Sequence, residues 1–228
     1  MVLRSLKAPI RKFPKKISVI NIGVDTNQFK FVDRSFKPPY KICMVGGMEP
    51  RKRIYSTIQM LADLNDKDFE LTVLKGWPPD ALGWYVDDCK NIADKLGVKI
   101  NFVGYMDHNK VQYIFYTQDL IISNSSMEGI HNSIAEAMAT GCYPLINAWS
   151  GSEDVYPFES IFKTQDGFIK KIKAWKKSKS KLELSKKSRK WVEEKYDLNK
   201  IAKKMKKEIE DSFSKKWGQK QECSKTNL

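Results

Sequence analysis

The sequence has no apolar run long enough to cross a membrane. No 18 consecutive residues among its 228 are apolar, and the N-terminus lacks the continuous apolar core of a secretory signal. Histidine and cysteine are scarce, and the two histidines and four cysteines do not show the short spacings of a zinc site. We therefore expect a cytoplasmic protein with reduced thiols and no structural metal.

Acidic residues are few at the two ends of the chain, so the formal net charge of +14 is unevenly distributed. Residues 1–16 carry six basic and no acidic side chains, whereas residues 17–169 carry 14 basic and 19 acidic ones. Residues 170–220 carry 20 basic and 7 acidic side chains, a formal charge of +13. Such basic ends suit an anionic surface, either phospholipid headgroups or nucleic acid. A solvated, lysine-rich helix surface is the alternative.

Hydrophobic residues make up 41% of the sequence, enough for a sizeable core, and their pattern alternates between strands and helices. Apolar runs predict strands, and apolar residues spaced three and four apart predict helices. The alternation implies one α/β domain with a parallel sheet covered on both faces, of the Rossmann-like, doubly wound type. We expect strands at residues 17–22, 40–45, 69–74, 99–103, 119–123 and 143–146, and helices at 51–64, 81–96 and 107–116.

The predicted domain covers residues 17–213. Residues 1–16 contain two prolines and several basic residues, which is typical of a linker or of the remnant of an upstream domain. Residues 214–228 are polar, and we expect them to form a disordered tail. The last helices of the domain are expected at 167–177, 180–195 and 198–213.

The segment from Asn124 to Gly141 holds two carboxylates, Glu128 and Glu136, with seven residues between them. It follows a predicted strand and leads into an Ala- and Met-rich helix that we expect to begin near Ile130. Both carboxylates would lie near the carboxyl end of a parallel strand, where open α/β sheets bind ligands. Since carboxylates are rarely buried without a partner or a function, they are candidate ligand-binding groups. Two surface carboxylates near a helix start are the alternative.

Five segments resemble, in order, motifs of the group 1 glycosyltransferases. They are Asn21-Ile22-Gly23-Val24-Asp25 with Phe29 for N-G-V-D…F, residues 41–52 for V-G-R-L…K-G, Asn101-Phe102-Val103-Gly104 for V-x-F-x-G, residues 128–144 for E-G…E-A-M-A-x-G-x-P, and Gly151-Ser152-Glu153 for G-x-x-E. Over residues 17–210 the chain is similar to the C-terminal, donor-binding domain of these retaining enzymes, which have a two-domain GT-B architecture. The resemblance implies binding of a nucleoside-diphosphate sugar without a metal or cofactor.

The resemblance also implies roles for individual side chains. Glu128 would face the hydroxyls of the donor sugar and Glu136 would hold the nucleotide ribose, because an ionised carboxylate can accept from two vicinal hydroxyls. Lys52 matches the phosphate-binding lysine and would stabilise charge on the departing nucleoside diphosphate, although an ordinary exposed lysine is the alternative. The diphosphate would also meet backbone N–H groups at the helix start. These belong to Gly129, Ile130, His131 and Asn132.

Further donor contacts are implied in three loops. Tyr105 and Met106 fall where the family passes the nucleobase, and plain packing is their alternative role. Glu153 lies in the loop after the next strand, where it is either a donor contact or a turn residue. Gly46 and Gly47 form the turn after the strand 40–45 and would lie beside the phosphates.

Two positions depart from the family pattern. Gly47 stands where the family has an arginine, so one diphosphate contact is missing. Arg51 and Arg53 are the candidates to replace it, and solvated charge is the alternative for both. His131 stands where a second glycine is common, and a capping or packing role is the alternative to a donor contact there.

In this family an N-terminal Rossmann-like domain binds the acceptor and closes over the donor. The chain begins close to the linker between the two domains, so we expect an excised domain, a truncated product or half of a split enzyme. Alone it should transfer a hexose to a saccharide or lipid-linked acceptor poorly, because the acceptor is not oriented and water is not excluded. An inactive homologue that docks on a partner, or through residues 170–220 on the inner face of an anionic membrane, is the alternative. No recognised nucleic-acid-binding motif accompanies the charge.

Overall fold

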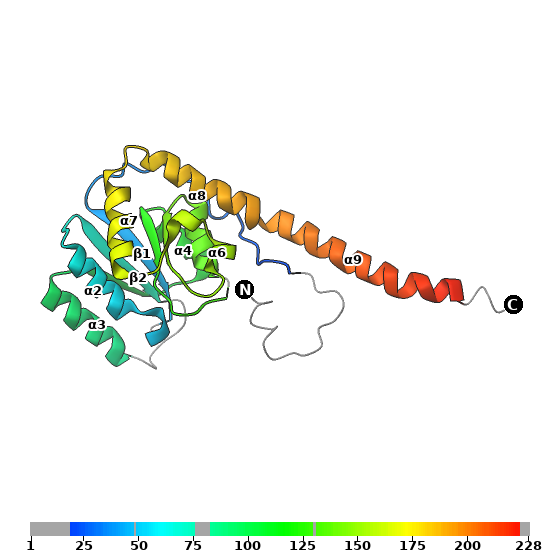
Figure 1. The fold of residues 1–228 in the computed structure, drawn as a ribbon, viewed down its shortest axis with the longest axis horizontal. Helices are drawn as coiled ribbons and strands as arrows, with labels where there is room; N and C mark the ends of the chain where they lie inside the picture. The colour runs from blue at the N-terminus through cyan, green and yellow to red at the C-terminus, as the bar shows by residue number, and fades with distance from the viewer. Residues whose placement is uncertain (1–18, 48, 76–82, 130, 224–228) are drawn as a thin grey trace.

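The computed structural model describes residues 19–47, 49–75, 83–129 and 131–223, which form an α/β domain with a long C-terminal helix (Figure 1). A parallel sheet with the strand order β3-β2-β1-β4-β5-β6 forms its centre. The strands are β1 (Tyr40–Gly46), β2 (Phe69–Lys75), β3 (Ile100–Tyr105), β4 (Leu120–Ser123), β5 (Tyr143–Asn147) and β6 (Ile161–Phe162). The strand order reverses between β1 and β4, the point at which doubly wound sheets bind ligands. The predicted Rossmann-like fold class is confirmed.

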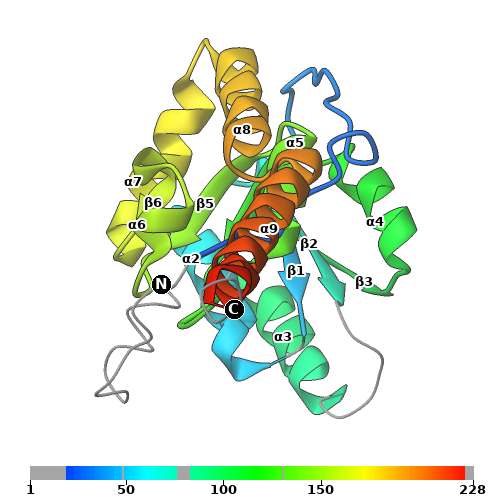
Figure 2. The same cartoon turned by 90° about the vertical axis from the view of Figure 1, so that its right-hand side faces the viewer.

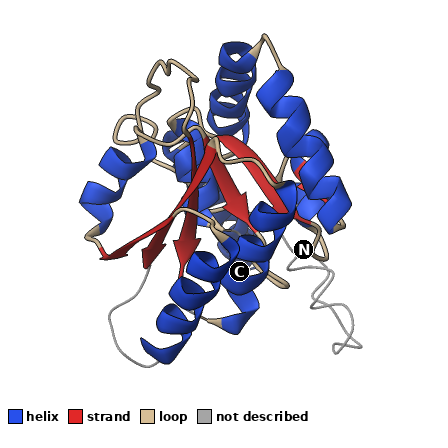
Figure 3. Cartoon of the chain, turned by 90° about the vertical axis from the view of Figure 1, so that its left-hand side faces the viewer, coloured by secondary structure: helices blue, strands red, loops and turns tan. Residues whose placement is uncertain are grey.

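Helices lie on both faces of this sheet, as Figure 3 shows with the strands between two helical layers. They are η1 (Pro50–Lys52), α2 (Ile54–Leu64), α3 (Gly83–Leu96), α4 (His108–Phe115), α5 (Asn132–Ala139), α6 (Ser152–Val155), η2 (Phe158–Ser160), α7 (Gln165–Lys177), α8 (Lys181–Lys195) and α9 (Leu198–Cys223). Neighbouring strand residues point to opposite faces. Ile42 and Leu120 therefore pack with α2, α3 and α7, whereas Cys43 and Ile121 pack with α4, α5 and α8.

Helix α8 ties the C-terminal helices to the domain by its contacts with the end of α5. Ser185 Oγ donates to the carbonyl oxygen of Gly141 at 2.6 Å. The Arg189 guanidinium donates to the carbonyl oxygens of Ala139 and Phe29 at 3.0 Å and 2.7 Å. The bond to Ala139 satisfies a carbonyl group at the end of helix α5, and the three bonds together fix α8 over the sheet.

Helix α9 leaves the domain and points toward the viewer in Figure 2. Its apolar side chains Leu198, Met205, Ile209 and Phe213 share one face, and their exposed fraction rises from 44% at Leu198 to 64% at Phe213. The helix predicted to end at residue 213 continues to Cys223, into the segment predicted as a disordered tail. Lysine and glutamate are good helix formers, and no proline follows Pro157 to end the helix.

The predicted strand at residues 17–22 does not form in its described part, residues 19–22. The β-branched residues there find no strand to pair with, because the segment runs beside the start of α9 instead. The contact includes a bridge, in which the Val24 N–H donates to Tyr196 O at 2.7 Å and the Leu198 N–H donates to Val24 O at 3.0 Å. The predicted linker at residues 1–16 lies outside the described residues.

The helix predicted for residues 51–64 is divided in two. Arg53 adopts a left-handed backbone conformation, with φ 56° and ψ 41°, between η1 and α2. This conformation costs a residue with a side chain about 1 kcal/mol, and it turns η1 toward the carboxyl end of β1. No described helix is both long and apolar enough to span a bilayer.

Candidate functional site

The candidate site lies at the carboxyl ends of β1 and β4, where the loops after these two strands meet. The Ser126 N–H donates to Arg51 O at 3.0 Å, which joins the loop after β4 to η1. Asn124 Nδ2 donates to Thr57 Oγ1 at 3.2 Å and so joins the same loop to α2. The two loops are thus held together by hydrogen bonds before any ligand binds.

Lys52 and Glu128 form an ion pair at the centre of this site. Lys52 Nζ lies 2.5 Å from Glu128 Oε1, and only 6% of the Lys52 residue surface is exposed. Arg51 Nη1 approaches the same oxygen at 3.3 Å. Burial alone would raise the pKa of the Glu128 carboxyl, but the hydrogen bond from Lys52 and the other neighbouring groups together more than offset this, and the pKa is lowered from its usual value. The site therefore contains an ionised carboxylate held by cations.

Gly46 makes room for the Lys52 side chain. A Cβ atom at Gly46 would come within 2.8 Å of Lys52 Cε, and the φ angle of Gly46 is 155°. Gly47 lies beside Glu49, whose carboxylate binds the Arg51 guanidinium at 2.5 Å. Of the two candidate arginines, Arg51 reaches Glu128 with its side chain, whereas Arg53 contributes its carbonyl oxygen, which accepts from Asn124 Nδ2 at 3.4 Å.

The side chain of His131 lies between the two central strands. Its Nε2–H donates to Val45 O at 3.2 Å, and its Nδ1 lies 3.2 Å from Ser123 Oγ. Burial and the nearby Lys52 ammonium lower the pKa of His131 to about 4. The ring is therefore neutral near pH 7, so Nδ1 accepts from the Ser123 hydroxyl, and His131 adds no positive charge beside Glu128.

Glu136 has different surroundings, on the side of α5 that faces α4. Its Oε1 lies 2.8 Å from Nε2 of His108, and the exposed fraction of the side chain is 12% for Glu136 and 66% for His108. Burial raises the pKa of the Glu136 carboxyl, and the contact with His108 offsets this only in part. We did not predict a role for His108; the one available signal was its position two residues after Met106.

The remaining predicted residues lie in the loops around this site or outside it. Gly129 is exposed and Asn132 begins α5, while Ile130 lies outside the described residues. Tyr105 is exposed at the end of β3 and Met106 packs against the core. Glu153 lies on α6, where its Oε2 is 3.5 Å from Ser152 Oγ.

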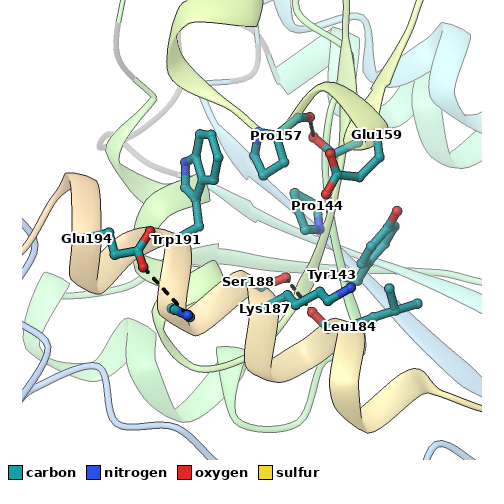
Figure 4. A pocket seen from close by; sticks show the side chains of 11 residues that line it. Tyr143, Pro144, Pro157, Glu159, Leu184, Lys187, Ser188, Trp191 and Glu194 are labelled. Carbon is teal, nitrogen blue, oxygen red and sulfur yellow. Dashed lines mark hydrogen bonds and ion pairs between the residues drawn. The ribbon is translucent and has the colours of Figure 1, made fainter.

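A separate cavity of about 360 Å³ lies at the opposite end of the sheet (Figure 4). Its walls include Tyr143 and Pro144, the first residues of β5, and Trp191 of α8. The candidate site follows the carboxyl ends of β1 and β4, so this cavity is not part of it.

Across the part of the chain that the structure describes, no three His, Cys, Asp or Glu side chains gather as a metal site would require.

Comparison with known proteins identifies the family. The model of the family described as glycosyl transferases group 1 matches residues 25–220. A tRNA-queuosine alpha-mannosyltransferase from Drosophila melanogaster is 27% identical over 86 residues, which are 38% of this chain and 23% of that protein.

Solved structures show the same fold. A glycosyltransferase from Rickettsia africae superposes with a TM-score of 0.78 at 18% identity, over 92% of this chain and 61% of that one. The Anabaena protein HepE, in complex with UDP and glucose, superposes with a TM-score of 0.75 at 15% identity, over 85% of this chain and 57% of that one. This chain spans less than two thirds of the length of the Drosophila, Rickettsia and Anabaena proteins. It has the fold of the C-terminal half of a GT-B enzyme, and it belongs to the group 1 glycosyltransferases.

Proposed function

We propose that this chain is the donor-binding domain of a retaining glycosyltransferase that moves a hexose from a nucleoside-diphosphate sugar to a saccharide or lipid-linked acceptor. The observation that carries the proposal is the buried Lys52–Glu128 pair at the strand-order reversal, beside the start of α5. A cation and the N–H groups of a helix start suit a diphosphate, and a carboxylate suits sugar hydroxyls. The UDP and glucose bound by the Anabaena protein support this class of donor.

The ion pair suggests how donor binding proceeds. Lys52 and Glu128 are bonded to each other, so each must exchange its partner when the donor binds. The diphosphate takes the Lys52 ammonium, and the Glu128 carboxylate then accepts from the sugar hydroxyls. Phosphate binding and sugar binding are therefore coupled, and a nucleoside diphosphate alone should leave Glu128 without its strongest partner.

Lys52, Arg51 and the start of α5 supply the positive charge at the diphosphate in this proposal, in place of a divalent cation. Bond cleavage leaves negative charge on the departing diphosphate, and a fixed ammonium group stabilises that charge in a site that excludes water. The acceptor would be oriented by an N-terminal domain, in the same protein or as a separate chain. Such a domain would account for the greater length of the relatives, and without it transfer should be slow.

Isothermal titration of the folded chain with UDP, GDP and ADP tests the donor-site proposal. At least one of the three should bind, and the Lys52→Met variant should bind it at least tenfold more weakly because a charge-assisted contact is lost. Lys110→Gln is the matched control, since Lys110 is exposed and contacts Asp107 rather than the site. A folded chain that binds none of the three nucleotides would overturn the proposal.

A second candidate is an inactive homologue that docks peripherally on an anionic membrane. The exposed apolar face of α9, together with the formal charge of +13 over residues 170–220, favours it. The chain should sediment with phosphatidylglycerol vesicles at low salt, and the Ile209→Lys variant should stay in the supernatant. Equal sedimentation with neutral phosphatidylcholine vesicles, or none with either, would contradict this candidate.

A further inference from the structure

We propose that His108 is a positioning residue for the nucleotide ribose, which it affects by holding the Glu136 carboxylate that is to bind the ribose hydroxyls. The inference rests on the proposed donor function and adds a residue to it. The contact that carries it joins His108 Nε2 and Glu136 Oε1 at 2.8 Å. An ionised carboxylate can only accept, so His108 Nε2 carries the donated hydrogen.

The His108 ring is itself held in place. It lies edge to face against Phe29, with ring centroids 5.6 Å apart, and Phe29 is buried. The carbonyl oxygen of Phe29 accepts from the Arg189 guanidinium of α8 at 2.7 Å. This series of contacts, from α8 through Phe29 to His108, therefore fixes the direction from which His108 contacts Glu136, although most of the His108 side chain is exposed.

The contact leaves part of the carboxylate free for a ligand. Among the described residues, Glu136 Oε2 has no hydrogen-bond partner, and Oε1 keeps a second lone pair. Two vicinal ribose hydroxyls could donate to these positions while His108 stays bound. Without His108 the carboxylate is free to rotate, and the ribose would have to order it on binding.

His108 also influences the charge of Glu136. Burial raises the pKa of the Glu136 carboxyl, and the His108 contact lowers it toward the usual value. Other charged groups on the neighbouring helices have partners of their own. On α4, Asp107 and Lys110 face each other at 3.9 Å, and on α8, Arg189 binds backbone carbonyl oxygens and the Glu193 carboxylate. A protonated Glu136 loses acceptor positions, so nucleotide affinity should fall as pH decreases through its pKa. Removing His108 should move that loss to higher pH.

The test compares His108→Ala with His108→Gln, because neither variant titrates at position 108 and only glutamine retains an N–H donor. Titration with UDP, GDP and ADP at pH 7 should show affinity about fivefold weaker for His108→Ala, with most of the loss restored by His108→Gln. The 2′-deoxy form of the nucleotide that binds should lose little further affinity in His108→Ala. Lys110→Gln, on the same helix, should bind like the unmodified chain.

A second measurement needs no nucleotide. Carboxyl carbon NMR titration of the free chain should give a higher Glu136 midpoint in His108→Ala than in the unmodified protein, with His108→Gln between them. An unchanged midpoint, or equal nucleotide affinity in the alanine and glutamine variants, would overturn the role of His108. Absence of nucleotide binding by the unmodified folded chain would instead overturn the proposed donor function, whatever the titration shows.

Discussion

Glu128 and Glu136 lie on either side of the start of α5, and they have opposite electrostatic surroundings. Glu128 accepts from the buried Lys52 ammonium, with Arg51 close by, and its pKa is lowered. Glu136 meets one exposed histidine, and burial keeps its pKa raised. The first carboxylate is stabilised as an ion in the free protein, whereas the second is ionised at some cost.

The difference separates two tasks that the same residue type can perform. A carboxylate with a strong internal partner binds a ligand by exchanging that partner, so its affinity depends on what the ligand offers the lysine. A carboxylate with a weak partner is available at once, and its affinity depends on pH. Substitutions at the two carboxylates and at their neighbours can test each part of this comparison.

The largest effect is expected from removing the charge of Glu128. Glu128→Gln leaves the Lys52 ammonium buried beside a neutral amide, so the free energy of unfolding should fall by about 3 kcal/mol. Urea denaturation measures it. The double variant Lys52→Met with Glu128→Gln should recover most of the loss, because it buries no charge. A single variant as stable as the unmodified protein would show that the pair is not energetically coupled.

His131 should give the Glu128 side a pH-dependent stability. The pKa of His131 is lowered from 6.5 to about 4, so the unfolded chain binds more protons between these values and stability falls as pH decreases through that window. The contribution is roughly 3 kcal/mol in full. His131→Gln should flatten the dependence on pH in denaturation experiments run from pH 7 to pH 4, and an unchanged slope would contradict a buried, neutral histidine.

Glu136→Gln should have a much smaller effect on stability than Glu128→Gln. The raised pKa of Glu136 means that folding favours the protonated form, so a neutral amide removes a cost at pH 7. We expect the free energy of unfolding to change by less than about 1 kcal/mol, while nucleotide affinity decreases. Comparing both glutamine variants in one denaturation series provides the control, and equal losses would remove the contrast between the two carboxylates.

Arg51→Gln should change stability least. Arg51 is partly exposed, and its shorter ion pair, with Glu49, is open to solvent, so a loss of about 0.5 kcal/mol is expected. If Arg51 replaces the arginine that the family has at the position of Gly47, the free energy of nucleotide binding should change by more than the free energy of unfolding. Salt screens exposed charges, so the affinity lost in Arg51→Gln should be smaller at high salt than at low salt. An equal loss at both salt concentrations would argue against an exposed phosphate contact.

The sequence predicted the fold class, because the apolar runs of the sheet are a local pattern. Lys52, Glu128 and Glu136 could be selected as candidates from motifs within short segments, and their roles stay predictions. The Lys52–Glu128 ion pair could not be predicted, because it joins two segments that are far apart in the sequence. It also depends on the left-handed backbone at Arg53 and on the absence of a side chain at Gly46. His108 was missed for the same reason, since its partner is 28 positions away.

Local pattern also misled at the two ends of the domain. The β-branched residues 19–22 have the composition of a strand, but no sheet edge is available to them, and they run beside α9. Polar residues after Phe213 suggested disorder, although a helix needs no apolar residues to continue its backbone hydrogen bonds. In both places the deciding factor was what the segment meets in space.

The length of α9 has a consequence for amide hydrogen exchange. Twenty-six helical residues extend about 39 Å, and its first turns contact residues 19–24 of the domain. Isolated helical turns in water are marginal, so protection should decrease from Leu198 toward Cys223. A surface that covers Met205, Ile209 and Phe213 would remove this gradient, and slowed exchange along α9 would then report binding at this face directly.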